Sequence, residues 1–270
     1  MVVINFCSFY SEGPPNDEAN NYSDLVPEIL KNANGHFNNI NFYTPNKLRE
    51  LGYSKYLKTH ELYEKSKLWS PIEKIGLSAF RPAMLLHELS KMNDGDILVY
   101  RDINWKKYPT YRNFDEFPEL AEKILSQCQF DFYVSSDTPR SVNIKLNNFT
   151  KSKVIRELGE NAEIFKHVNT FHANMFVIRK SKISIDLLTE WQTAMENDDW
   201  LNGDISDEPD QNILFHAIDQ SILSVIIYNW IRKRKHNIPL KYPFIEIDVY
   251  HTGKIINISE QFYEYLKYLT

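Results

Sequence analysis

Two oxygen-bearing side chains, two positions apart, form the first candidate site. Asp102 and Asn104 follow the apolar run at residues 97–100, which has the length and composition of a buried strand. Where the chain stays extended, side chains at i and i+2 point the same way. Carboxylate and amide oxygens suit Mg²⁺ or Mn²⁺, which then bridges to substrate phosphates. An ordinary turn after a strand has the same spacing, so spacing alone leaves both interpretations open.

Two further polar segments could join that site. Asp219 and Gln220 begin an otherwise apolar helical stretch at residues 218–231, although the helix dipole also favours an acidic first turn. His251 and Lys254 follow a strand-like run near the C-terminus. Imidazole is a common metal ligand and lysine binds phosphate, although a lone histidine is more often structural.

Apolar segments of two kinds alternate along the chain and must position these side chains. Strands are predicted at residues 2–7, 40–43, 97–100, 130–134, 175–178 and 245–249. Helices are predicted at residues 82–92, 117–128, 150–158, 183–195 and 218–231, with Pro82 at a first helical position and Thr150 as a cap. The alternation predicts an α/β fold, whose ligands bind beyond the carboxyl ends of the strands.

Composition narrows the class of protein. Hydrophobic residues make up 43% of the 270 residues, which is ample for a core. The net charge of −5 argues against a general nucleic-acid binder. Two cysteines suggest neither a disulfide framework nor a zinc site, and no apolar run approaches the ~20 residues of a membrane span. We expect a cytoplasmic protein with no nucleic-acid partner and no membrane span.

The order of the segments resembles the GT-A glycosyltransferases. Phe80-Arg81-Pro82, an amphipathic helix and residues 93–102 are similar to the region that introduces the metal-binding DxD motif of that family. Asn104 replaces the second carboxylate of the motif here. Phe149-Thr150-Lys151 is similar to the YTK segment of bacterial and viral polysaccharide transferases in this group.

Three later segments extend the resemblance, which spans roughly residues 75 to 255. Residues 172–178 occupy the place of the strand that cradles the donor sugar. Residues 216–223 are similar to the DQxxL helix of the retaining galactosyltransferase-like families, and His251 stands where those families have a third metal ligand. The histidine motif is shorter than in those families.

The resemblance implies one GT-A (Rossmann-like) domain over residues 1–270: a mixed, mostly parallel sheet with helices on both faces. Its donor half would cover about residues 1–135 and its acceptor half about residues 136–270. The implied activity is metal-assisted, retaining transfer of a sugar from a nucleotide-sugar to a glycan or other hydroxyl acceptor, with Mn²⁺ or Mg²⁺. This activity suits polysaccharide biosynthesis in the cytoplasm, or in a host's cytoplasm if the protein is viral.

The resemblance also implies roles for individual residues. Asp219 and Gln220 would be catalytic. Metal ligands would be Asp102, Asn104 and His251, and the acceptor would contact Asp137 and Lys151. Donor contacts would be Ser8, Phe9, Tyr10, Thr44, Arg81, Asp102, Asn174 and Lys254.

Two other classes of protein stay open. A sugar nucleotidyltransferase would share the sheet and the metal, but it should carry a basic, Gly-rich loop after the first strand. Residues 11–17 contain no Lys or Arg, which counts against this alternative. A non-catalytic nucleotide-sugar binding protein with a decayed site is the other alternative, and Asn104 is the feature that favours it.

Overall fold

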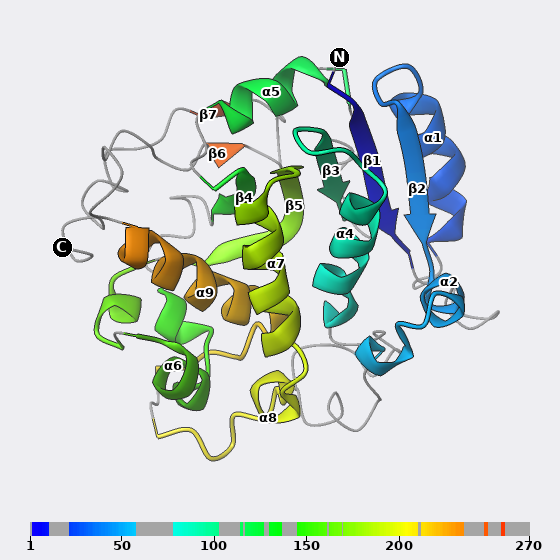
Figure 1. Cartoon of the computed structure of the whole chain (residues 1–270). Helices are drawn as coiled ribbons and strands as arrows, with labels where there is room; N and C mark the ends of the chain where they lie inside the picture. The colour runs from blue at the N-terminus through cyan, green and yellow to red at the C-terminus, as the bar shows by residue number, and fades with distance from the viewer. Residues whose placement is uncertain are drawn as a thin grey trace.

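A five-stranded sheet in the order β2-β1-β3-β5-β4 forms the centre of the protein (Figure 1). The computed structural model describes residues 2–10, 22–57, 78–102, 114–115, 117–126, 130–136, 145–160, 162–168, 170–209, 212–234, 246–247 and 255–256. The strands are β1 (Ile4–Phe9), β2 (Asn39–Tyr43), β3 (Ile97–Arg101), β4 (Phe132–Ser136) and β5 (Phe171–Arg179).

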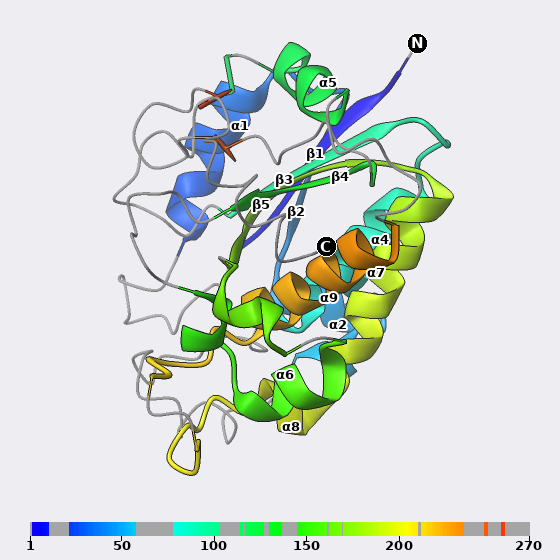
Figure 2. The ribbon, with the colours of Figure 1, turned by 90° about the vertical axis from the view of Figure 1, so that its left-hand side faces the viewer.

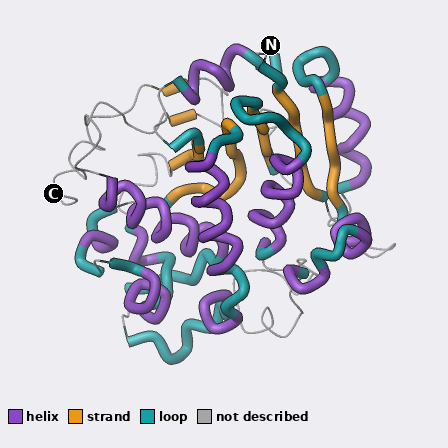
Figure 3. The backbone as a smooth tube through the Cα atoms, in the orientation of Figure 1, coloured by secondary structure: helices purple, strands orange, loops and turns teal. Residues whose placement is uncertain are grey.

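The sheet is mixed and mostly parallel, as the sequence predicts. β1 pairs in parallel with both β2 and β3, whereas β5 runs antiparallel to its neighbours β3 and β4. β2, β1, β3 and β4 therefore point one way, and their carboxyl ends lie at the same edge of the sheet. Figure 3 shows the strands in orange among the helices in purple.

Helices cover both faces of the sheet, which confirms the predicted layering (Figure 2). One face carries α1 (Val26–Ala33) and α5 (Glu119–Leu125). The other carries α4 (Phe80–Ser90), α7 (Lys182–Ala194) and α9 (Asp219–Arg234). Three shorter helices complete the described set: α2 (Pro45–Glu50), α6 (Ser152–Leu158) and α8 (Asp198–Leu201).

Because side chains alternate along each strand, the core has two parts, one on each face of the sheet. Phe6 and Val99 pack with α1 and α5, whereas their neighbours Cys7 and Tyr100 pack with α4. Successive side chains of a strand point to opposite faces, so a central strand covered on both sides is mostly apolar. Every residue of β1 and β3 is accordingly buried.

The roles predicted for Pro82 and Thr150 at helix starts differ from the structure. α4 begins at Phe80, so Pro82 is its third residue and Arg81 lies within the first turn rather than just before the helix. Proline is tolerated throughout a first turn because the N–H groups there have no intrahelical partner. Thr150 does not cap α6, because the N-cap position belongs to Lys151, which makes no side-chain capping bond.

Of the strand predicted at residues 245–249, the described part is Glu246–Ile247 (β6). It is a strand and pairs antiparallel with Ile255–Ile256 (β7) in a separate two-stranded sheet. None of the helices in the described ranges combines the length and apolar character that crossing a bilayer requires.

Candidate functional site

Three of the predicted site residues meet beyond the carboxyl end of β3. Arg81 comes from the first turn of α4, Asp102 directly follows β3, and Asp219 is the first residue of α9. Arg81 Nη1 donates to Asp219 Oδ2, and Arg81 Nη2 donates to both carboxylate oxygens of Asp102 at 3.3 Å. The side chains are only 8%, 13% and 16% exposed for Arg81, Asp219 and Asp102. The fold thus joins three distant segments through one guanidinium group.

Tyr100 completes this group, which we call the Arg81 cluster: Arg81, Tyr100, Asp102 and Asp219. The Tyr100 hydroxyl donates to Asp102 Oδ1 and accepts a bond from Arg81 Nε at 3.3 Å. The guanidinium carbon of Arg81 lies 5.5 Å from the centroid of the tyrosine ring. Tyr100 was not among the predicted site residues. Its position two residues before Asp102 could have indicated it, because side chains at i and i+2 of a strand lie on the same face.

The charges of the cluster do not cancel, because one guanidinium faces two carboxyl groups. Burial raises the pKa of Asp219 to about 6, Arg81 acts to lower it, and Asp102 acts to raise it. Burial alone would lower the pKa of Arg81, but Tyr100, Asp102 and Asp219 together hold it above its ordinary value. Arg81 therefore stays charged at neutral pH. The cluster favours a ligand that brings a cation or hydroxyl donors to the excess carboxylate.

The backbone before Asp219 is held in an uncommon conformation. Ile218 has φ of +45°, in the left-handed region that a β-branched residue rarely adopts. Its carbonyl nevertheless accepts the Ile222 N–H at 3.0 Å, and Ile222 and Leu223 are fully buried. Backbone strain of this kind persists where the surrounding contacts hold the residue in its conformation, and it is found mostly at functional sites. The start of α9, and with it Asp219, is thus fixed in position.

Asn174 and Gln220 lie beside the cluster. The backbone N–H of Asp102 donates to the Asn174 carbonyl at 2.7 Å, which ties the end of β3 to β5. The Gln220 side chain, next to Asp219 in the first turn of α9, donates from Nε2 to Thr170 Oγ1 at 3.4 Å. The structure therefore brings these two predicted residues to the same edge of the sheet as Asp102.

The backbone of Lys151 is bound to the segment that precedes α9 through a buried histidine. The Lys151 N–H donates to His216 Nδ1 at 3.4 Å, and His216 Nε2 donates to the Trp200 carbonyl at 2.7 Å. Burial lowers the pKa of His216 to about 4, so the ring is neutral at physiological pH and can make both bonds. Next to Lys151, the buried Thr150 hydroxyl has no hydrogen-bond partner among the described residues. His216 and Thr150 were not among the predicted site residues.

Ser8 and Phe9 have internal contacts. β1 extends through Phe9, two residues beyond its predicted end, so both side chains belong to the buried strand. The Ser8 hydroxyl donates to the Arg101 carbonyl at 2.5 Å. The Phe9 ring packs on Phe80 with centroids 4.1 Å apart. These contacts position β3 and α4, and the predicted donor contacts of both residues stay predictions.

Tyr10 and Thr44 follow the first two strands, as predicted. Tyr10 is partly buried, with its ring edge-on to Phe42 at a centroid distance of 6.3 Å. Thr44 is the N-cap of α2, where its hydroxyl accepts the Lys47 N–H at 3.2 Å. A threonine before a proline is a typical helix start, and this signal accounts for the position of Thr44.

Asp102 is the one predicted metal ligand that the described ranges contain. The other two, Asn104 and His251, lie outside these ranges, as do Asp137 and Lys254. Within them, no group of three or more His, Cys, Asp or Glu side chains could hold a metal ion. The Asp102 oxygens and the excess negative charge nevertheless suit a hard divalent cation, which would share this carboxylate with Arg81.

Comparisons with known proteins found no relative of this chain. No protein-family model matches the sequence, no curated protein matches it significantly, and no solved structure matches the fold significantly.

Proposed function

We propose that this protein is a GT-A glycosyltransferase that moves a sugar from a nucleotide-sugar donor to a glycan or other hydroxyl acceptor. The observation that supports the proposal most is the Arg81 cluster. It gathers Arg81, Asp102 and Asp219 beyond the carboxyl end of β3, the edge at which open α/β sheets bind their ligands. These are residues to which the resemblance assigns donor binding and catalysis.

Arg81 serves the donor by charge and by position. The first turn of α4 carries backbone N–H groups that have no intrahelical acceptor, and Arg81 adds a permanent positive charge to that turn. A donor diphosphate is the kind of anion that such a helix start binds, and the divalent cation would offset the excess negative charge of Asp102 and Asp219 beside it. The same guanidinium holds the side chains of Asp102 and Asp219 in fixed orientations, which pre-organises the site before the donor arrives.

Asp219 serves the donor sugar by accepting hydrogen bonds. Its pKa of about 6 leaves it mostly ionised at neutral pH, and an ionised carboxylate accepts strong hydrogen bonds from sugar hydroxyls. Gln220 and Asn174, which lie beside the cluster, extend the polar surface that the sugar would contact. A retaining transfer requires no strong base for the acceptor hydroxyl. If the reaction inverts configuration, Asp219 and Asp137 are the candidates for that base.

Mn²⁺ or Mg²⁺ would be held by Asp102 together with Asn104 and His251, and when bound it would offset the charge of the departing diphosphate. Asn104 contributes a neutral amide oxygen where a DxD motif has a carboxylate. We therefore expect weaker metal binding than a full DxD motif gives.

Donor cleavage tests the proposal. The protein is incubated with a panel of nucleoside-diphosphate sugars, with and without Mn²⁺, and release of nucleoside diphosphate is measured. We expect slow hydrolysis of at least one donor and thermal stabilisation by the same donor. Stabilisation without hydrolysis or transfer would instead identify a non-catalytic nucleotide-sugar binding protein. Formation of a nucleotide-sugar from a nucleoside triphosphate and a sugar phosphate would identify a nucleotidyltransferase.

A further inference from the structure

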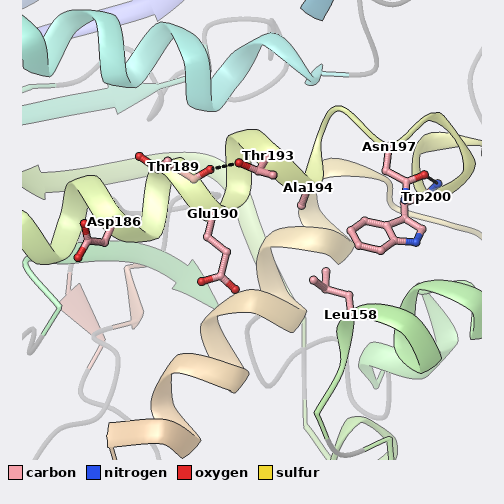
Figure 4. A pocket seen from close by; sticks show the side chains of 8 residues that line it. All are labelled: Leu158, Asp186, Thr189, Glu190, Thr193, Ala194, Asn197 and Trp200. Carbon is pink, nitrogen blue, oxygen red and sulfur yellow. Dashed lines mark hydrogen bonds between the residues drawn. The ribbon is translucent and has the colours of Figure 1, made fainter.

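A hollow of about 640 Å³ lies along α7, away from the residues of the Arg81 cluster. It is bounded by α7, the end of α6 and α8 (Figure 4). No residue of the cluster lines it, so it is a separate feature of the fold. Its lining includes Leu158, Asp186, Thr189, Glu190, Thr193 and Trp200.

One end of the hollow is apolar and firmly held. Figure 4 shows the indole of Trp200 beside Leu158 at this end. The indole N–H donates to Glu157 Oε2 at 2.9 Å, and the Trp200 carbonyl accepts the bond from His216 at 2.7 Å. The ring is therefore fixed in orientation, and its N–H is already used. What Trp200 offers a ligand is a flat apolar face, which suits the C–H face of a sugar ring.

The remaining wall presents hydrogen-bond acceptors. The Thr189 and Thr193 hydroxyls donate to backbone carbonyls of α7 at 2.8 and 2.9 Å, which leaves their lone pairs to accept (Figure 4). Asp186 Oδ2 accepts from Lys182 and Glu190 Oε2 from the indole of Trp230, both at 2.6 Å. Among the described residues, the other oxygen of each carboxylate has no donor.

The lining also disfavours negatively charged ligands. None of the described residues that line the hollow is basic, whereas two are acidic. The diphosphate of a nucleotide-sugar would face Asp186 and Glu190, so the hollow cannot serve as a second donor site. A neutral molecule with many hydroxyl donors and one apolar face fits both the acceptors and the indole.

We propose that this hollow is a carbohydrate-binding subsite, which takes a neutral glycan of more than one sugar unit, with the C–H face of one unit on Trp200 and the hydroxyls of the others directed at the two threonines, Glu190 and Asp186. The subsite does not depend on the reaction proposed for the Arg81 cluster.

Direct binding tests this proposal. The labelled full-length chain is applied to an array of neutral, sialylated and sulfated oligosaccharides, with hexalysine as a cationic probe. Thr193 is exposed, so Thr193→Lys should fold normally while it fills the hollow and adds a positive charge. The matched control is Ser90→Lys at the end of α4, which makes the same charge change at another exposed helical position.

We expect neutral glycans to bind, sulfated and sialylated glycans to bind more weakly, and Thr193→Lys to weaken neutral binding about tenfold or more. Ser90→Lys should bind like the unmodified chain. Trp200→Phe provides a second variant, which keeps most of the packing and should also reduce binding. Melting curves verify that each variant is folded.

The proposal is overturned if no neutral glycan binds, if a folded Thr193→Lys variant binds neutral glycans as well as Ser90→Lys does, or if hexalysine alone binds. Donor hydrolysis is measured on the same preparations and should be unchanged in Thr193→Lys. A failure of glycan binding and a failure of donor cleavage are therefore separate results.

Discussion

Arg81 and Asp219 lie 138 positions apart in the sequence and form an ion pair in which neither side chain is more than 13% exposed. The pair connects the first turn of α4 to the first residue of α9. Because Arg81 also binds Asp102, the same guanidinium fixes the end of β3. The position of the proposed donor site thus depends on one arginine.

The first prediction concerns that ion pair. Arg81→Met should lower the free energy of unfolding by about 3–5 kcal/mol, because it leaves two buried carboxyl groups without their cation. Adding Asp219→Asn to Arg81→Met should recover part of this loss, since it removes one of those charges. Urea denaturation of the two single variants and the double variant gives the coupling energy, which we expect to exceed about 1 kcal/mol.

The exposed pair Lys55–Glu196 is the matched control for this cycle. Its side chains are 63% and 46% exposed, so solvent screens the attraction. Lys55→Met and Glu196→Gln should couple much more weakly than Arg81→Met and Asp219→Asn do. Equal coupling energies for the two pairs would show that burial of the Arg81 pair has no energetic consequence.

The second prediction concerns donor affinity. Asp102→Ala should abolish Mn²⁺-dependent donor binding, because it removes the carboxylate predicted to hold the ion. Tyr100→Phe removes only the hydroxyl that bonds Asp102 and Arg81, so it should weaken donor binding less while the buried ring still packs. Titration calorimetry measures both effects. Unchanged donor affinity in folded Asp102→Ala would exclude Asp102 from the donor site.

The third prediction concerns Asn104, which lies outside the described residues. If its amide oxygen binds the cation, Asn104→Asp should tighten Mn²⁺ binding, because a carboxylate is the stronger ligand for a hard cation. The measurement is a metal titration with and without donor. Unaltered Mn²⁺ affinity would place Asn104 away from the metal.

The fourth prediction concerns stability against pH. The pKa of His216 falls from 6.5 to about 4 on folding, so its contribution to stability is complete above pH 6.5 and is lost as the pH falls toward 4. The pKa of Asp219 rises from 3.8 to about 6, so its ionisation lowers stability above pH 6, and this cost disappears as the pH falls toward 3.8. The two effects oppose each other between about pH 4 and 6.

Asp219→Asn removes one of these two opposing effects. The variant should therefore lose stability more steeply than the unmodified chain between pH 6 and pH 4.5, by up to about 1.4 kcal/mol per pH unit. Urea denaturation at several pH values measures the slopes. Identical slopes would mean that the pKa of Asp219 is not raised by folding.

Hydrophobic periodicity was enough to predict the elements that carry the site. The apolar run before Asp102 and the apolar helix after Asp219 are strong local patterns, and both elements are confirmed. Their meeting at Arg81 could not be predicted from local patterns, because it depends on how α4 and α9 pack on the sheet. The resemblance to a known family was the one sequence signal that grouped these residues.

Ser8 and Thr44 show that a polar residue at the end of a strand is not by itself evidence of a binding site. The first strand was predicted to end before Ser8, but the Ser8 hydroxyl donates to the Arg101 carbonyl and the strand continues through Phe9. The Thr44 hydroxyl caps a helix that was not predicted. A polar residue beside a strand can therefore have a local partner instead of a ligand, and sequence alone does not distinguish these roles.

The central claim is that the Arg81 cluster is the donor site of a glycosyltransferase, and Asp219→Asn tests it most directly. The change is nearly isosteric and removes a carboxyl group whose ionisation burial disfavours, so the melting temperature at neutral pH should not fall. Glu119→Gln, in the exposed first turn of α5, is the matched control for an acidic helix start. The measurement is a melting curve together with the rate of nucleoside diphosphate release from the preferred donor, on one preparation of each variant. We expect a rate about 10²-fold lower or more in Asp219→Asn and an unchanged rate in Glu119→Gln; lost stability with full activity in Asp219→Asn would mean that Asp219 is a structural residue and not part of the donor site.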